Sequence, residues 1–303
     1  ASRYALATPQ NNLSKDTLVI GTSVSGTVVR TREAIGVARD QGMTTVAITA
    51  NATSPFGTTA EHILDCTVPN FVDFPGVRSY RVSLLVQYLI AIRIAETRDS
   101  ITQHKAVQLR NQLIASGDAI ESTIEATRST IIDLAKNFSQ QNHFVFVGHG
   151  PNYATAMFGA AKFLEAAGTH AVAQDTEEWC HLQYFTNTDI HTPTFIISPG
   201  YRSHKRTAEM LISMNRIGRY TIGVCPENDN LVGNQCDVLL PVIGNTPEIF
   251  SPLVYPTATE LFADYLASNI GEDYFRGFKG LYDVTKLTPL TGNSIRTSDP
   301  MPL

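Results

Sequence analysis

Hydroxyl and glycine residues gather in one short stretch near the amino terminus, TLVIGTSVSGTVVRT, at positions 17–31. Ser23, Ser25 and Thr27 place hydroxyls at alternate positions, and Gly26 lets the backbone approach a ligand closely. A helical pattern follows, and the first turn of a helix leaves N–H groups without partners inside that helix. These groups together suit a phosphate monoester. The same residue types are common in ordinary strand-to-helix turns, so composition alone leaves both interpretations open.

The cysteines do not indicate metal or redox chemistry. No pair among Cys66, Cys180, Cys225 and Cys236 has the CxxC spacing of a zinc site or a redox motif. Cys66, Cys225 and Cys236 lie in apolar, strand-like contexts, where cysteine acts as a small core residue. We therefore expect no metal and no cofactor, and this cysteine usage is typical of a cytoplasmic protein.

The bulk composition limits the class of partner. A chain of 303 residues with 43% hydrophobic content can bury a large core, or two. A net charge of −5 gives no electrostatic case for nucleic acid or an anionic membrane. No window approaches the roughly 18 apolar residues of a membrane span. The first ten residues, ASRYALATPQ, also lack the basic region and apolar core of a signal peptide. We expect a small-molecule partner.

Continuous apolar runs alternate with helical patterns along the chain, and this alternation predicts parallel sheets covered by helices. The predicted strands lie at 17–22, 44–50, 63–68, 144–148, 170–174, 194–198, 220–224 and 238–242. The predicted helices lie at 28–41, 81–96, 102–136, 154–167 and 257–270, with breaks in the third considered at Asp118 and Ser122. The sequence therefore predicts the α/β class.

An internal repeat appears within this order. An offset of 176 residues superposes Gly42 on Gly218, and it pairs GMTTVAIT with GRYTIGVC. The same offset places Ile20 on Ile196, so we expect two similar α/β units. The hydroxyl-rich loop is not repeated, because residues 23–26 fall opposite residues 199–202, Pro-Gly-Tyr-Arg. We expect the first unit to hold an anion and the second to supply another function.

Three motifs in this chain resemble the double-domain form of the SIS (sugar isomerase) family. TSVSGT at 22–27 is similar to the family's Ser-x-Ser-Gly-Glu-Thr phosphate loop. GHGPNYATAMFGAAKFLEAAGTHA at 148–171 looks like a Gly-Arg-Gly-x-x-Tyr…Ala-Leu-Lys-x-x-Glu stretch in the isomerase half of glucosamine-6-phosphate synthases. EEWCH at 177–181 is similar to their Gly-Glu-x-x-His-Gly-Pro segment. The motifs occur in family order, and the resemblance extends from about Thr17 to Gly280.

The resemblance implies two flavodoxin-like or Rossmann-like SIS subdomains with parallel sheets. The first would lack its initial βα unit, because only sixteen residues precede Thr17. We expect a short first domain at 1–100, linking helices at 101–140, a second domain at 141–260, and a terminal helix and tail at 261–303.

The resemblance also implies the catalytic residues. Glu165 would carry a proton between adjacent carbons of an open-chain phosphosugar through an enediol. His181 would help to open the sugar ring, and in relatives this residue reaches the site of a neighbouring subunit, which implies a homodimer. Alternatives remain open at both positions: Glu165 as a solvated helix residue, and His181 as a half-buried residue with satisfied hydrogen bonds.

Substrate contacts follow from the same motifs, with some departures. The residues implied to bind substrate are Ser23, Val24, Ser25, Gly26 and Thr27 in the phosphate loop, and Val77 and Ser79 in the GVRSYR segment. Thr27 and Val28 stand where the family has Glu and a phosphate-binding Thr. Gly280 stands where the synthases carry a tail lysine that forms a Schiff base, and Lys279 is its neighbour.

The leading hypothesis is therefore an aldose–ketose isomerase acting on a hexose or amino-sugar 6-phosphate, with deamination or deglycation as a coupled outcome. The second hypothesis is a non-catalytic sugar-phosphate-binding or regulatory protein, based on the departures above. A third is an α/β oligomer with a vestigial site.

Overall fold

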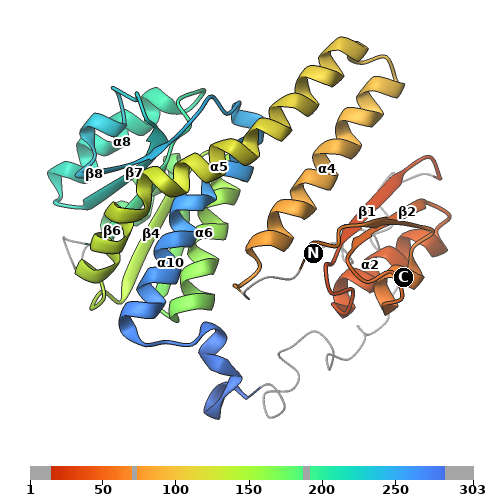
Figure 1. The fold of residues 1–303 in the computed structure, drawn as a ribbon, viewed down its shortest axis with the longest axis horizontal. Coiled ribbons are helices and arrows are strands. Elements are labelled where there is room, and N and C mark those ends of the chain that lie inside the picture. The colour runs from red at the N-terminus through yellow and green to blue at the C-terminus, as the bar shows by residue number, and fades with distance from the viewer. Residues whose placement is uncertain (1–14, 70–73, 187–191, 284–303) are drawn as a thin grey trace. The chain divides into compact units, whose positions relative to one another are not determined.

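Strands and helices alternate along the chain in a computed structural model that describes residues 15–69, 74–186 and 192–283 (Figure 1). The chain forms two compact units, one of Ala1–Ile94 with Phe278–Leu303 and one of Ala95–Gly277. In the described residues each unit has a single sheet, and every strand pair is parallel. The predicted α/β class with parallel sheets is confirmed. The four-part division at 100, 140 and 260 stays a prediction.

The first unit has a three-stranded sheet in the order β1-β2-β3. Its elements are β1 (Leu18–Thr22), α2 (Val29–Asp40), β2 (Thr44–Thr49), α3 (Pro55–Thr59), β3 (His62–Asp65) and the start of α4 (Val77–Thr97). Helices α2 and α3 pack on one face, where Ile35, Ala47 and Phe56 form a core. On the opposite face Leu18 and Ile20 are 42% and 37% exposed.

The second unit has a five-stranded sheet in the order β5-β4-β6-β7-β8. The strands are β4 (His143–Gly148), β5 (His170–Asp175), β6 (Pro193–Ile197), β7 (Tyr220–Pro226) and β8 (Val238–Val242). The α-helices are α5 (Gln103–Asn137), α6 (Pro151–Ala167), α7 (Thr176–His181), α8 (His204–Arg216), α9 (Ser251–Val254) and α10 (Pro256–Ile270). Short 3₁₀ turns lie at Gln183–Phe185, Gly233–Gln235 and Glu248–Phe250. A further 3₁₀ turn, Tyr274–Phe278, lies at the boundary between the units, and the turn at Gly280–Tyr282 belongs to the first unit.

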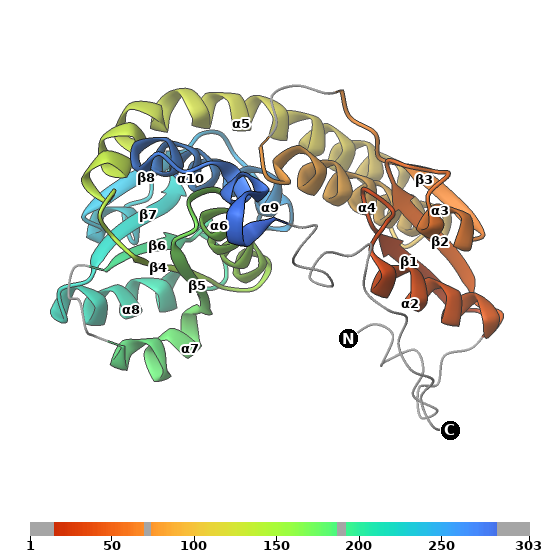
Figure 2. The same ribbon diagram turned by 90° about the horizontal axis from the view of Figure 1, so that it is seen from below.

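Alternating side chains along β4 explain how this sheet is covered on both faces. Phe144 and Phe146 face α6 and α10, where Phe163 and Phe262 complete an aromatic cluster. Val145 and Val147 face the other way and pack with Trp179 of α7 and residues of α8. Figure 2 shows α5, α6 and α10 on one side of the sheet and α7 and α8 on the other. Two buried faces account for the continuous apolar runs of these strands.

The predicted repeat is present in the hydrogen bonding of the two units. Gly42 and Gly218 both have φ of +78°. The hydroxyl Oγ1 of Thr45 accepts from the backbone N–H of Glu61 at 2.9 Å, and Thr221 accepts from that of Asp237 at 3.0 Å. These equivalences keep the 176-residue offset. The first sheet therefore corresponds to β6-β7-β8, and β4 and β5 have no counterpart among the described residues.

The offset slips by one residue in the first strand of each repeat. Ile20 pairs with Val46, whereas the residue that pairs with Ile222 is Phe195. Ile20 therefore corresponds to Phe195, and its predicted match to Ile196 is wrong. The slip moves the loops as well, so the residue equivalent to Ser23 is Ser198.

Helix α5 runs for 35 residues without a break, so the breaks considered at Asp118 and Ser122 are absent. Packing against α10 and β8 holds this helix together, which is a case of tertiary contacts overriding local propensity. A stripe of small residues, including Ser116, Ala119 and Thr123, is buried along it.

In the described part of the chain, no helix is long and apolar enough to cross a membrane.

Candidate functional site

The loop between β1 and α2 has a fixed backbone. Ser23 donates its N–H to the carbonyl of Ile48 at 3.0 Å, and Gly26 donates to the carbonyl of Ser23 at 3.0 Å. Gly26 has φ of +69°, and a Cβ added there would lie 1.9 Å from Oγ of Ser54. Only glycine fits this position, because a side chain would meet both a strained backbone and a neighbouring hydroxyl.

Three hydroxyls belong to this loop, and their partners differ. Ser23 is 6% exposed, and its Oγ has no hydrogen-bond partner among the described residues. The hydroxyls of Ser25 and Thr27 lie 2.8 Å apart, so Thr27 places its oxygen beside that of Ser25. A buried hydroxyl without a partner carries a desolvation cost that a bound acceptor would remove. The loop therefore offers donors that the protein itself does not use.

The amino terminus of α2 adds further donors. Val28 is its N-cap residue, and in the described part of the chain no side chain caps this end. The N–H groups of the first turn thus lack the usual Ser, Thr, Asp or Asn acceptor. Uncapped N–H groups beside the Ser23 hydroxyl form an arrangement that suits an anion.

Val77 and Ser79 lie in the first turn of α4, in the same unit as this loop. Both side chains are partly exposed, and Ser79 donates its hydroxyl to the carbonyl of Gly76 at 3.0 Å. Gly76 has φ of +64°, which lets the chain turn into α4. Among the described residues, no hydrogen bond joins Ser79 to the Ser23–Thr27 loop.

Glu165 lies in the last turn of α6 and is paired with a lysine. Its carboxylate forms an ion pair with Nζ of Lys162, one turn earlier on the same helix. The Lys162 side chain is only 5% exposed and its ammonium lies 4.8 Å from the centroid of the Phe158 ring, whereas the Glu165 side chain is 36% exposed. Glu165 is therefore accessible to a ligand yet held by a buried cation, which a freely solvated helix residue would lack.

Sequence reasoning missed Lys162. A signal for it was present, because the AAKFLEAA segment carries a lysine inside an apolar run at i, i+3 spacing from Glu165. Residues at this spacing share one face of a helix.

His181 is the last residue of α7 and belongs to a charged network. Its Nε2 lies 3.1 Å from Oε1 of Glu177, and Arg206 donates to both carboxylate oxygens of Glu177 at 2.6 and 3.0 Å. The hydrogen bonds from Arg206 and then His181 lower the pKa of Glu177. The His181 side chain is 63% exposed, so its interpretation as a half-buried residue is wrong.

Asp175 positions the helix that carries His181. Its Oδ1 accepts the N–H of Glu177 at 2.9 Å and so caps α7. Its Oδ2 lies 3.0 Å from Nδ1 of His149, in the loop after β4. This carboxylate thus ties two loops together at the carboxyl edge of the sheet.

Glu165 and His181 lie at opposite ends of the strands in the second unit's sheet, Glu165 at the amino ends and His181 at the carboxyl ends. Strands β4 and β5 are paired from His143 with His170 to Gly148 with Asp175. Helix α6 returns to the amino end of β5, whereas α7 leaves its carboxyl end. Five residue steps of a strand span roughly 16 Å. A single copy of this unit therefore does not bring the two side chains together.

The remaining predicted position, Lys279, is exposed and lies between two 3₁₀ turns after α10. Its neighbour Gly280 has φ of +60°. The described residues contain no group of three or more His, Cys, Asp or Glu side chains that could hold a metal ion.

Similar proteins add a separate line of evidence. The chain is 26% identical over 273 residues to a glutamine–fructose-6-phosphate aminotransferase (isomerizing) of Gloeobacter violaceus, and the match covers 90% of this chain. This chain spans 44% of the length of that relative.

Solved structures of low sequence identity share the fold. The C-terminal domain of glucosamine-fructose-6-phosphate aminotransferase from Francisella tularensis matches 88% of this chain and 75% of that chain, with a TM-score of 0.79 at 18% identity. Glucosamine-6-phosphate deaminase from Thermotoga maritima matches 89% of this chain and 74% of that chain, with a TM-score of 0.57 at 14% identity.

The model of one protein family, the SIS domain, matches residues 4–93 and 137–263. These two segments include the loop after β1 and the helix that carries Glu165. More than half of the chain lies within the match, and the chain therefore belongs to the SIS domain family.

Proposed function

We propose that this chain is a phosphosugar isomerase that interconverts the aldose and ketose forms of a hexose or amino-sugar 6-phosphate. The observation that carries this proposal is the buried hydroxyl of Ser23, which has no partner among the described residues. A phosphate oxygen would accept from Ser23, from Ser25 and from the uncapped N–H groups of α2. Such charge-assisted hydrogen bonds are stronger than those between neutral groups.

The proposed chemistry uses Glu165 as the group that moves a proton. With an open-chain aldose, its carboxylate takes the proton from C2 while the carbonyl oxygen at C1 takes a proton from water, which gives an enediol. Glu165 then returns its proton to C1, and the O2 hydroxyl releases its proton to water as the ketone forms. Lys162 acts as a positioning residue, because its ion pair fixes the carboxylate on the face of α6. Val77 and Ser79 would line the sugar chain, with Val24 and Gly26 completing the phosphate loop.

Ring opening would fall to His181 of a second copy of the chain. The separation of Glu165 and His181 at opposite ends of the strands of one sheet supports this assignment, because a single copy of the unit does not bring them together. We propose a homodimer for this reason. The amino-sugar substrates would place the reaction in amino-sugar metabolism, where deamination or deglycation would accompany the proton transfer.

The experiment compares the wild type with Glu165→Gln on fructose 6-phosphate, glucosamine 6-phosphate and a fructosamine 6-phosphate. Products are followed by NMR, and binding is followed by calorimetry. We expect Glu165→Gln to lose turnover while it retains sugar-phosphate affinity. Glu125→Gln, an exposed site on α5, is the matched control and retains activity. A wild type that turns over none of the three, or a fully active Glu165→Gln, contradicts the proposal.

A second candidate is a non-catalytic sugar-phosphate-binding or regulatory protein. The observation that favours it is Gly280 at the position where the resemblance places a tail lysine, with only Lys279 beside it. Sugar-phosphate binding that Ser25→Ala weakens, without turnover of any substrate and without an effect of Glu165→Gln, is the outcome that selects this candidate.

A further inference from the structure

The corner of the second unit that corresponds to the phosphate loop is filled by the protein's own side chains. Ser198, the counterpart of Ser23, has its Oγ 3.2 Å from Nδ1 of His204. Nε2 of His204 lies 3.4 Å from the buried carboxylate of Asp229. Tyr201 donates its hydroxyl to the carbonyl of Thr246 at 3.3 Å and so ties the corner to the loop after β8. An anion has no place here, because the hydroxyl is engaged and a buried carboxylate lies behind it.

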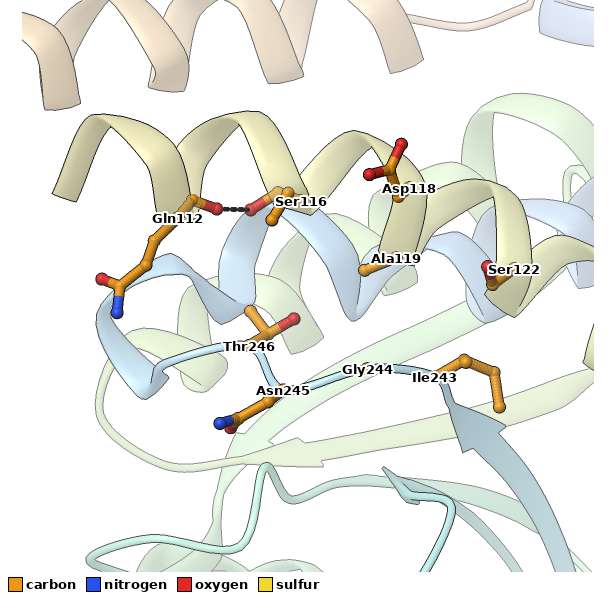
Figure 3. A pocket seen from close by; sticks show the side chains of 10 residues that line it. Gln112, Ser116, Asp118, Ala119, Ser122, Ile243, Gly244, Asn245 and Thr246 are labelled. Atoms are coloured by element: carbon orange, nitrogen blue, oxygen red, sulfur yellow. Dashed lines mark hydrogen bonds between the residues drawn. The ribbon is translucent and has the colours of Figure 1, made fainter. Parts of the chain in front are cut away.

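The same carboxyl edge of the sheet holds an open pocket beside β8. Its volume is about 230 Å³, and it lies between one face of α5 and the loop that follows β8 (Figure 3). The pocket is lined by Gln112, Ala115, Ser116, Asp118, Ala119, Ser122, Ile243, Gly244, Asn245 and Thr246. In open α/β sheets, ligands bind outside the carboxyl ends of the strands.

Small residues keep this pocket open and a hydrogen bond fixes its shape. Ser116 and Ala119 on α5 are buried, and a Cβ added to Gly244 would lie 3.6 Å from that of Ala119. The loop is held to the helix by Ile243, which donates its N–H to Oγ1 of Thr123 at 3.0 Å. The walls are therefore set before any ligand arrives.

The groups that face the pocket are neutral and polar. Gln112 and Ser122 extend from α5 toward the loop, whereas Asp118 points away from it (Figure 3). The side chains of Gln112, Ser122 and Asn245 make no hydrogen bond to another described residue. The ten lining residues include no lysine, arginine or histidine, and the one carboxylate nearby disfavours an anion. Amide and hydroxyl groups offer both donors and acceptors, which is what a sugar hydroxyl needs.

We propose that this pocket binds an uncharged polyhydroxylated ring of monosaccharide size, at a site distinct from the phosphate loop of the first unit. The pocket volume of about 230 Å³ lies below the roughly 300–1,000 Å³ of pockets for drug-sized ligands, as a ligand the size of one sugar ring requires.

The test uses D-glucose as the probe in saturation-transfer NMR on the full chain. Glucose shows a signal in the wild type, and saturating fructose 6-phosphate leaves the signal in place because the two sites are separate. Ala119→Leu fills the pocket and removes the signal, whereas Ala126→Leu, on the exposed side of α5, retains it. Asn245→Ala raises the glucose Kd roughly 3- to 10-fold through one lost hydrogen bond. Asn228→Ala, in the exposed loop after β7, leaves the Kd unchanged.

Asn245→Ala decides the outcome if Ala119→Leu fails to fold by circular dichroism. The proposal is overturned by a wild type without a glucose signal, by displacement of glucose with fructose 6-phosphate, or by a folded Ala119→Leu that binds glucose normally. An unchanged Kd in Asn245→Ala overturns it as well. Loss of turnover in Glu165→Gln is measured separately from glucose binding, so failure of this pocket proposal and failure of the isomerase proposal are distinguishable.

Discussion

Ser23→Ala should change the stability of the chain and its affinity for a sugar phosphate in opposite directions. The Ser23 hydroxyl is buried at 6% exposure and has no hydrogen-bond partner among the described residues. Leaving such a group unsatisfied costs roughly 1–3 kcal/mol, which the free protein carries and a bound phosphate would remove. Replacing the hydroxyl with hydrogen therefore leaves the free energy of unfolding unchanged or raises it by about 1 kcal/mol.

The affinity should fall, because the hydroxyl donates to a charged acceptor only in the complex. A hydrogen bond to a charged group contributes roughly 1.5–3 kcal/mol, and every 1.4 kcal/mol is about tenfold in Kd. Ser23→Ala should thus raise the Kd for fructose 6-phosphate roughly 10- to 150-fold. Calorimetric titration measures the affinity, and urea unfolding followed by circular dichroism measures the stability.

The internal repeat supplies a matched control at Ser198. This residue is also buried, at 1% exposure, but its hydroxyl is bonded to His204. Ser198→Ala should lower the free energy of unfolding by roughly 0.5–1.5 kcal/mol and leave the Kd unchanged. If Ser23→Ala destabilises the chain as Ser198→Ala does and binds fructose 6-phosphate normally, the Ser23 hydroxyl is structural and our reasoning about the loop is wrong.

Three further predictions follow from the geometry. Gly26→Ala should destabilise the chain by roughly 1–3 kcal/mol and abolish binding, since its Cβ would lie 1.9 Å from Oγ of Ser54; normal urea midpoints and affinity would contradict this. Arg206 holds the pKa of Glu177 below its usual 4.5. The stabilisation of the fold by this ionised carboxylate is therefore present above pH 4.5 and is lost as the pH falls through the lowered pKa. Urea midpoints should therefore fall less between neutral and acidic pH in Glu177→Gln than in the wild type, and parallel curves would refute this. Burial raises the pKa of the Cys236 thiol to about 12, so alkylation near neutral pH should require unfolding, and rapid labelling of the native chain would oppose this.

Much of the fold follows from the sequence because its strands are buried on both faces. Runs such as FVFVG and YTIGV leave little choice of element, and all eight predicted strands are present. The breaks considered in α5 were wrong because they rest on local propensity. Gly117 and Asp118 lie on its exposed side, while the stripe that includes Ala119 and Thr123 packs against the rest of the unit.

The register of the repeat was harder to predict. A one-residue slip between the first strands of the two units is invisible in a short alignment of apolar residues, since Phe195 and Ile196 are equally strand-like. The backbone pairing of Phe195 with Ile222 reveals it. Only this correction identifies Ser198 as the counterpart of Ser23.

The candidate site could be predicted in part. The hydroxyl loop is local in sequence, so its residue types suffice to suggest an anion. Two properties of the site depend on packing, which residue spacing alone does not reveal. The Ser23 hydroxyl has no hydrogen-bond partner in the part of the chain that the structure describes, and Glu165 is paired with Lys162. By contrast, the placement of Glu165 and His181 at opposite ends of β5 follows from chain order, because Glu165 precedes this strand and His181 follows it.

Solvent deuterium exchange tests the central claim most directly, that Glu165 moves a proton between adjacent carbons of a bound sugar phosphate. The wild type is incubated in D₂O with glucose 6-phosphate and with glucosamine 6-phosphate, and deuterium at C1 and C2 is followed by NMR. We expect a turned-over substrate to gain deuterium in the wild type and none in Glu165→Gln, with sugar-phosphate affinity retained. Neither isomerisation nor exchange with either substrate in the folded wild type, or equal exchange in the variant, would contradict the account.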